Sequence, residues 1–155
     1  LVWHFIGPIQ SNKTKRISEL FDWVHSVDRM KVATRLNEFR PADQAPLNIL
    51  LQVNIDNEES KAGIQIDDIR PMAHSISTLK NLRLRGLMAI PRKNDDSEQQ
   101  RLPFIRMRKA LEGLQVTYPQ CDTLSMGMSN DLQTAIAEGS TLVRIGTAIF
   151  GTRLT

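Results

Sequence analysis

The sequence predicts an α/β fold, a (β/α)8 TIM barrel that is incomplete, with about six of the eight βα units. Two observations lead to this prediction. Short apolar runs, typical of covered parallel strands, alternate along the chain with amphipathic helical segments. The chain has 155 residues, of which 41% are apolar and 24% charged, and this composition fits one globular domain. We therefore expect residues 1–155 to form a single barrel domain.

Six segments carry the strand pattern. In chain order they are Val2–Ile6, Trp23–Val27, Leu47–Ile55, Leu82–Ile90, Thr123–Met126 and Leu142–Phe150. A closed barrel needs eight strands and about 250 residues. Six strands therefore predict an open wall with unpaired edges, and they indicate that two amino-terminal βα units are absent.

Helical periodicity follows each of these segments except the last. Asp28 is placed to cap the helix after the second segment, and Ser97 with Gln100 has the spacing of a capping box. Residues 132–136 carry an apolar stripe, and Gly139 is placed to end that helix. These patterns predict helices that pack against the sheet.

Composition limits the classes of function. No apolar run approaches the roughly 20 residues of a membrane helix, and no secretory signal is recognisable, so we expect a cytoplasmic protein without a membrane partner. The single cysteine, Cys121, cannot form an internal disulfide, and three widely spaced histidines predict no metal site.

The chain is mildly basic, with a formal charge of +3. Four basic residues lie within 101–109, which would suit a nucleic-acid patch. The preferred interpretation is a solvated outer helix face, because apolar residues alternate with the basic ones at helical spacing and no aromatic residues interleave. We expect no nucleic-acid partner.

The stretch from Ser125 to Gly151 carries polar groups at the predicted ends of the last two strands. Ser129 is expected to be both the N-cap of the next helix and a hydroxyl donor to an anion. Gly146 and Thr147 offer unobstructed backbone amides and a hydroxyl to the same anion. Barrels commonly hold phosphate at the loops after their last two strands. The sequence therefore predicts a phosphate-cofactor site here.

Arg144 is the most informative residue of this stretch. A guanidinium near the end of an apolar strand must find an acceptor when it is buried. A cofactor's ring nitrogen or phosphate would provide one. The alternative is a core arginine that is paired with a carboxylate such as Asp122.

Several motifs together resemble a known family. Trp3–Lys13, Glu59–Gly63, Arg85–Met88, Ser125–Ser129 and Arg144–Gly151 are similar, in order and approximate spacing, to the pyridoxal phosphate homeostasis proteins, the small relatives of alanine racemase. The resemblance covers essentially the whole chain. It implies a barrel of the alanine racemase N-terminal-domain type.

The resemblance also implies a cofactor and its binding residues. Ser129, Gly146 and Thr147 would bind the phosphate of pyridoxal 5′-phosphate (PLP), and Arg144 would face the pyridine nitrogen. An arginine there leaves the nitrogen unprotonated, which weakens the ring as an electron sink. Lys61 corresponds to an arginine of alanine racemase near the phenolic oxygen of the cofactor, and a solvated loop charge is its alternative interpretation.

One element of the family pattern has no counterpart in the sequence. Family members attach PLP as a Schiff base to a lysine at the end of the first barrel strand, upstream of the residues present. We therefore expect the carboxy-terminal two-thirds of a PLP carrier or homeostasis protein, which holds free cofactor weakly and performs no catalysis. The parent is expected to be a monomer, whereas open strand edges predict self-association of this portion.

An enzyme is the alternative function, namely a PLP-dependent amino-acid racemase or lyase. Racemases of this type need a tyrosine as the acid/base on the opposite face of the cofactor. The single tyrosine, Tyr118, is predicted at the end of an outer helix. This position disfavours the racemase interpretation.

Overall fold

The computed structural model describes residues 1–58, 60–94 and 96–151. Its six strands form one sheet, and each strand pairs in parallel with the next along the chain. The strands are His4–Phe5 (β1), Trp23–Val27 (β2), Leu47–Gln52 (β3), Leu82–Met88 (β4), Thr123–Met128 (β5) and Leu142–Arg144 (β6). Sequential parallel order is that of a barrel wall, so the predicted incomplete (β/α)8 fold is confirmed.

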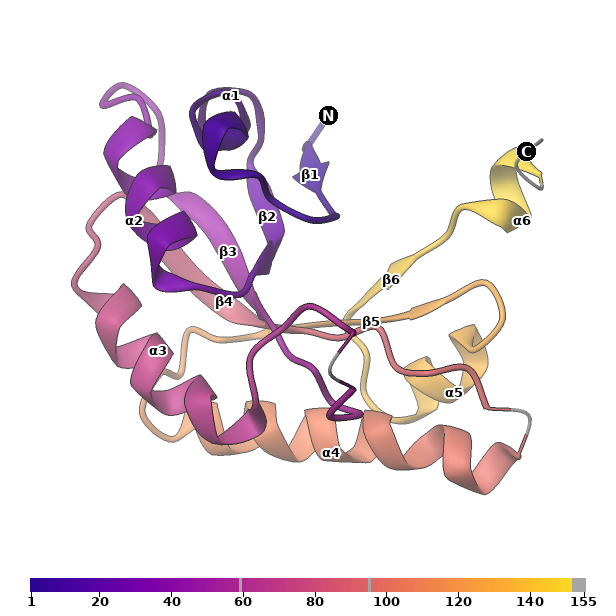
Figure 1. Cartoon of the computed structure of the whole chain (residues 1–155). Coiled ribbons are helices and arrows are strands. Elements are labelled where there is room, and N and C mark those ends of the chain that lie inside the picture. Colours follow the sequence, from indigo (N-terminus) through magenta and orange to yellow (C-terminus); the bar gives the residue numbers. More distant parts are fainter. Residues whose placement is uncertain (59, 95, 152–155) are drawn as a thin grey trace.

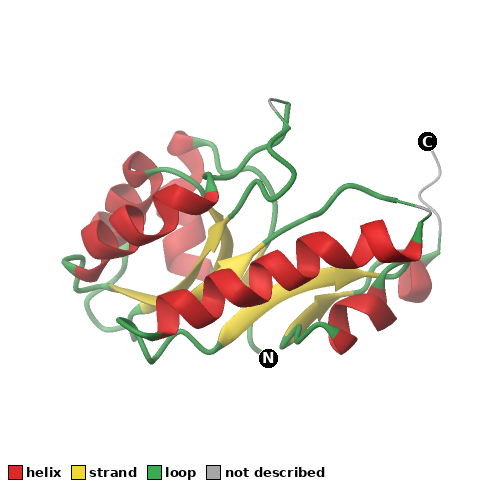
Figure 2. Cartoon of the chain, turned by 90° about the horizontal axis from the view of Figure 1, so that it is seen from below, coloured by secondary structure: helices red, strands yellow, loops and turns green. Residues whose placement is uncertain are grey.

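Helices connect consecutive strands and lie along the outside of the curled sheet (Figure 1). The elements are η1 (Ser11–Lys13), α1 (Thr14–Leu20), α2 (Met30–Phe39), η2 (Ile66–Asp68), α3 (Ile69–Ser77), α4 (Ser97–Gln115), α5 (Leu132–Ala137) and α6 (Thr147–Phe150). Figure 2 shows α4 running across the outer face of the sheet. None of the described helices has the length and apolar character needed to cross a bilayer.

The core lies between the sheet and these outer helices. Leu36, Ile76 and Phe104 come from α2, α3 and α4, and all three are buried with the strand residues Ile49 and Leu87. Burial of side chains of this size stabilises the fold by roughly 1.5–3 kcal/mol each. The apolar faces of the helices are therefore core, and only the strand ends and loops are left to carry a binding site.

The apolar stripe predicted for residues 132–136 is only partly buried. Ala135 of α5 is fully buried, whereas the side chain of Ile136 is 55% exposed. Gly139 has a φ of +93° and follows α5, as its predicted role in ending the helix requires.

The predicted last strand, Leu142–Phe150, is too long. The strand β6 ends at Arg144, and Thr147–Phe150 forms the short helix α6. Ile149 and Phe150 are 66% and 84% exposed, so the sheet does not cover them. A short continuous apolar run fits a buried strand and a helical segment equally well, and periodicity alone could not separate the two.

Two predicted helix caps are wrong. Arg29 occupies the N-cap position of α2, and the carboxylate of Asp28 accepts a hydrogen bond from the Arg29 guanidinium at 2.7 Å instead. At α4 the N-cap is Asp96, whose carboxylate accepts from two first-turn amides at 2.9 and 3.1 Å, and Ser97 is the first helical residue. Aspartate and serine both favour caps, so their neighbouring positions could not be ranked from sequence.

The basic residues of α4 mostly contact the protein itself. Arg101 Nη2 lies 2.6 Å from the Glu138 carboxylate, and Arg108 lies 3.8 Å from the same residue. Arg106 Nη1 donates to the carbonyl of Ile55 at 2.9 Å. These partners favour a structural outer face, and the expected absence of a nucleic-acid partner stays a prediction.

Candidate functional site

Four of the five predicted site residues lie at the carboxyl ends of β5 and β6. Ser129 follows β5, Arg144 ends β6, and Gly146 and Thr147 lie where the chain enters α6. A cavity of about 790 Å³ is lined by Ser129, Gly146 and Thr147, and a second of about 660 Å³ is lined by Arg144 and Gly146. Both cavities are also lined by Met128, so they adjoin at Met128 and Gly146.

Ser129 reaches the first cavity from a turn and not from a helix start. The helix α5 begins at Leu132 with Asp131 at its N-cap position, and the carboxylate of Asp131 accepts from the amide of Met128 at 2.6 Å. The prediction that Ser129 is the N-cap is therefore wrong, because the chain inserts a turn between β5 and the helix. Its half-buried side chain lines the cavity, where the hydroxyl can meet a ligand.

Gly127 and Gly146 are glycines for different reasons. Gly127 has a φ of +94°, and a Cβ on it would collide with the side chain of Ala135, so packing demands glycine there. A Cβ on Gly146, at a φ of −116°, would meet no protein atom within 4 Å. Gly146 itself lines both cavities. A ligand that approaches the backbone closely explains glycine at this position.

The backbone at this turn supplies hydrogen-bond donors. The amides of Gly146 and Thr147 precede or begin α6, where a helix provides no internal acceptors. Together with the hydroxyls of Ser129 and Thr147, they form a donor-rich cradle in the larger cavity. Such a set of neutral donors suits a phosphate group.

Arg144 is held by neutral oxygen atoms. Its Nη1 donates to the carbonyl and to the hydroxyl of Ser125 at 2.9 and 2.8 Å, and its Nη2 donates to the carbonyl of Ala89 at 2.8 Å. Burial lowers the pKa of this guanidinium, and the charge of Asp131 opposes that shift. These three hydrogen bonds leave two of the five guanidinium N–H donors without an acceptor among residues 1–58, 60–94 and 96–151. The free donors can meet a ligand.

The carboxylate alternative for Arg144 is wrong. Asp122 pairs instead with Arg85, whose Nη2 and Nε lie 2.6 and 3.1 Å from its two oxygens. This pair lowers the pKa of Asp122, chiefly through the hydrogen bond from Arg85. Asp122 precedes the first residue of β5, whereas Arg144 donates to Ser125 inside that strand.

The second cavity is mainly apolar around Arg144. Its apolar lining consists of Ile6, Ile90, Met128, Leu142, Val143 and Ile145, and its polar lining includes His4 and His25. Apolar walls with a single guanidinium at one end suit a flat aromatic ring that carries one hydrogen-bond acceptor. The cavity therefore complements the phosphate cradle beside it.

Three residues behind Arg144, namely Ser125, His25 and His4, were not among the predicted site residues. His25 Nδ1 lies 3.0 Å from the Ser125 hydroxyl, and His25 Nε2 lies 2.8 Å from Nδ1 of His4. His25 and Ser125 are fully buried, and His4 is half-buried. The available signal was the polar pair His25 and Ser26 inside an otherwise apolar strand, since buried polar side chains need specific partners.

Burial, with smaller contributions from the neighbouring His4 and Arg144, lowers the pKa of His25 to about 4. The imidazole is therefore neutral at physiological pH. Burial also lowers the pKa of His4, against the opposing charge of Asp22. Neither ring adds positive charge to the site.

Lys61 does not join the other four predicted residues. It lies in the loop after β3, and its ammonium is 3.1 Å from a carboxylate oxygen of Asp56 and 3.2 Å from one of Glu58. Its predicted role near the phenolic oxygen stays a prediction. Glu59, the first residue of its motif, lies outside the described residues. Among the described residues, no three metal-binding side chains gather into a possible metal site.

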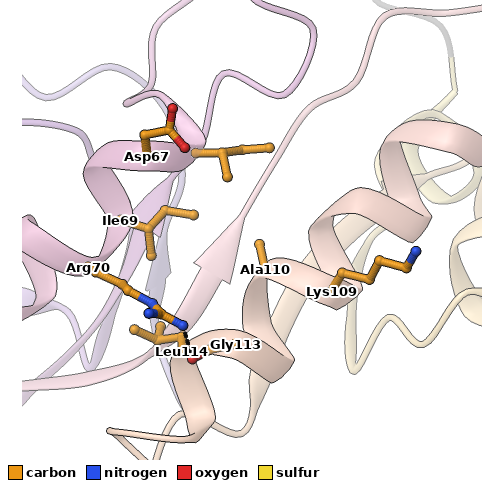
Figure 3. A pocket seen from close by; sticks show the side chains of 8 residues that line it. Asp67, Ile69, Arg70, Lys109, Ala110, Gly113 and Leu114 are labelled. Atoms are coloured by element: carbon orange, nitrogen blue, oxygen red, sulfur yellow. Dashed lines mark hydrogen bonds between the residues drawn. The ribbon is translucent and has the colours of Figure 1, made fainter.

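A groove away from this site lies between α3 and α4 (Figure 3). It has a volume of about 370 Å³ and is lined by Arg70, Lys109 and the backbone around Gly113, to which Arg70 donates at 3.3 Å. Residues of α3 and α4 line it, and none of the predicted site residues does.

The whole chain matches a described family and several curated proteins. Residues 2–154 match the family described as alanine racemase, N-terminal domain. A pyridoxal phosphate homeostasis protein of Escherichia coli K12 is 54% identical over 153 residues, and one of Pseudomonas aeruginosa is 56% identical over 153 residues. In both comparisons 99% of this chain is covered, and the chain spans 65% of the relative's length.

Solved structures agree with these relatives. PipY of Synechococcus elongatus PCC7942, with PLP bound, is 36% identical and superposes with a TM-score of 0.87, over 97% of this chain and 71% of PipY. An alanine racemase of Clostridium difficile 630 is 13% identical with a TM-score of 0.74, over 100% of this chain and 41% of that enzyme, which is a likeness of fold alone. The chain therefore belongs to the alanine racemase N-terminal domain family, and its curated relatives in that comparison are named pyridoxal phosphate homeostasis proteins.

Proposed function

We propose that this chain binds pyridoxal 5′-phosphate and contributes to intracellular PLP homeostasis as a cofactor carrier or reservoir. The observation that carries this proposal is the junction of two cavities at Gly146, one rich in hydrogen-bond donors and one apolar around Arg144. PLP has the matching parts, a phosphate and a flat ring with one nitrogen. The names of the curated relatives and the PLP bound to PipY support the same cofactor.

Different residues of the chain would bind different parts of the cofactor. Ser129, Thr147 and the amide of Gly146 would hold the phosphate, and the apolar walls would cover the ring. Arg144 would donate to the ring nitrogen and keep it unprotonated, because a guanidinium can only donate. When bound, the cofactor supplies an aldehyde and an electron-poor ring, and an unprotonated nitrogen makes that ring a weaker electron sink.

A role without catalysis is part of the proposal. Tyr118, the one tyrosine of the sequence, lines a cavity with Pro46 and Leu82 at the amino-terminal ends of β3 and β4. The candidate site lies at the carboxyl ends of the strands. This tyrosine is therefore at the wrong end of the sheet to act as acid or base in a racemase or lyase.

The remaining parts of the proposal concern domain, compartment and assembly. We propose that residues 1–155 form a single PLP-binding barrel domain, and that Lys61 lies near the cofactor's phenolic oxygen. The single cysteine, Cys121, is buried and free, which suits the reducing cytoplasm. The strands β1 and β6 end the described sheet, and such edges favour self-association of this chain.

A titration of the chain with PLP, followed by calorimetry and by cofactor absorbance, tests the proposal. We expect reversible binding, and inorganic phosphate should compete with it. Thr147→Val removes one cradle hydroxyl at nearly constant volume and should weaken PLP binding about tenfold. Gly146→Ala should weaken it at least as much without lowering the Tm, because its Cβ meets no protein atom.

The matched control is Thr78→Val, at the end of α3 and exposed. Its affinity for PLP should equal that of the unaltered chain. Equal affinities for Thr147→Val and Thr78→Val would contradict the cradle. A borohydride-stable adduct on one specific lysine would contradict reversible binding.

A further inference from the structure

We propose that Ser125, His25 and His4 form a directional hydrogen-bond chain that positions the guanidinium of Arg144 for the ring nitrogen of the ligand. The inference rests on the proposed function for the identity of the ligand. It goes beyond that function by naming three positioning residues that do not belong to the phosphate cradle. The chain of hydrogen bonds crosses four strands, from β6 through β5 and β2 to β1.

The direction of the chain follows from the donors that each group has. The Ser125 hydroxyl is buried, and its polar partners among the described residues are Arg144 Nη1 at 2.8 Å and His25 Nδ1 at 3.0 Å. Arginine has no acceptor, so the hydroxyl oxygen accepts from Arg144. The hydroxyl hydrogen must then go to His25. This assignment makes His25 Nδ1 an acceptor and fixes the proton of a neutral imidazole on Nε2.

The proton position on His25 also determines the direction of its hydrogen bond to His4. Since His25 Nε2 carries the proton, it donates to His4 Nδ1 at 2.8 Å. The His4 ring is in turn held by Trp23, against which it stacks with a centroid distance of 5.3 Å and an interplanar angle of 9°. Each ring thus receives one defined hydrogen bond, and the last ring is fixed by stacking at the wall of the ligand cavity.

A proton on His25 would break this arrangement. Its Nδ1 would become a donor, the Ser125 hydrogen would lose its acceptor, and a second cation would lie next to Arg144. The charged or titratable groups that act on His25 are His4 on β1 and Arg144 on β6. Both disfavour the extra proton, in agreement with the lowered pKa of His25.

Arg144 depends on the hydrogen bond to the Ser125 hydroxyl because only two other hydrogen bonds hold its guanidinium. Without the hydroxyl, Nη1 keeps the Ser125 carbonyl and Nη2 keeps the Ala89 carbonyl, and both bonds lie at one end of the guanidinium. Two bonds to neutral oxygens leave the planar group less well fixed than three. The donors that face the cavity would then be less well aimed at a ring nitrogen.

The first experiment determines the proton positions in the hydrogen-bond chain without any ligand. Nitrogen-15 NMR of the imidazoles in the unaltered chain should show His25 with a protonated Nε2 and an unprotonated Nδ1, unchanged from about pH 8 to about pH 5. A protonated Nδ1, or uptake of a proton by His25 in this range, would overturn the proposal whether or not the chain binds PLP.

The second experiment compares two ligands on variants of the chain. Ser125→Ala should raise the Kd for PLP about tenfold and change the Kd for inorganic phosphate by less than about twofold, because the hydroxyl contacts Arg144 and not the cradle. His25→Leu should act in the same way. His25→Asn returns an acceptor to the Nδ1 position and should recover most of the affinity for PLP.

Matched controls are Ser77→Ala and His74→Asn, both on the exposed side of α3. They should bind both ligands as the unaltered chain does. Equal loss of PLP and phosphate binding in Ser125→Ala, or no recovery in His25→Asn that is folded by circular dichroism, would overturn the positioning role. Failure of the unaltered chain to bind PLP would instead overturn the proposed function.

Discussion

Gly86 of β4 lies directly against the backbone of Thr123 in β5, and a Cβ on Gly86 would collide with the Thr123 carbonyl oxygen. The two residues are register partners, and two positions further along the same ladder Met88 pairs with Ser125. The next amide, of Ala89, donates to the Ser125 carbonyl at 3.1 Å. The close contact at one end of the strand pair thus sets the register that places the acceptors of Arg144 at the other end.

Gly86→Ala should destabilise the chain by about 3 kcal/mol, because the methyl group collides with backbone and the φ of +145° is strained for alanine. Urea unfolding followed by circular dichroism measures the change. Gly113→Ala on α4 is the control, since its Cβ makes only an ordinary 3.7 Å contact with Arg70. It should stabilise the helix by roughly 0.5–1 kcal/mol. A neutral Gly86→Ala would contradict the tight register.

Glu138→Ala should cost about 1–3 kcal/mol of stability, because the variant leaves Arg101 and Arg108 without the carboxylate that both contact. The Glu138 side chain is only 5% exposed. Glu112→Ala removes a 63% exposed carboxylate, 3.9 Å from Arg108, and should change stability by less than about 0.5 kcal/mol. Equal changes in Tm for the two variants would show that the buried Glu138 carboxylate stabilises the fold no more than the exposed Glu112 carboxylate.

His25 should make the chain less stable in mild acid. Above pH 6.5 both the folded and the unfolded chain carry a neutral imidazole, so protonation of His25 does not lower the free energy of unfolding there. As the pH falls from 6.5 toward about 4, the unfolded chain takes up the proton first, and the free energy of unfolding falls by roughly 2–3 kcal/mol. Urea titrations of His25→Asn should lack this part of the pH dependence, whereas exposed His74→Asn should keep it.

Cys121 should resist thiol reagents in the folded chain. Its side chain is fully buried, its Sγ lies 3.6 Å from the carbonyl of Leu84, and burial raises the pKa of the thiol to about 12. We expect modification by a disulfide reagent at pH 8 to be at least about a thousandfold slower than in denaturant, since the thiol must first be uncovered. Fast modification without denaturant would place Cys121 near an open edge.

The order of strands and helices could be predicted from the sequence because each depends on local periodicity. Trp23–Val27 is a strand with the predicted bounds, and a helix follows it as expected, Met30–Phe39. Local signals failed where two structures share one pattern. The apolar residues of α6 fit a strand as well as a helix, and Asp131, not Ser129, occupies the N-cap position of α5.

By itself the sequence determined which residues could form a phosphate cradle, because Ser129, Gly146 and Thr147 lie within a few residues of two strand ends. Only the tertiary structure decided what surrounds Arg144. His25 and Ser125 are 100 residues apart in the chain, and their hydrogen bond exists because parallel strands bring distant segments to one buried position. Burial then determines where the protons of the Ser125 hydroxyl and the His25 imidazole lie, and these positions cannot be predicted from a local sequence pattern.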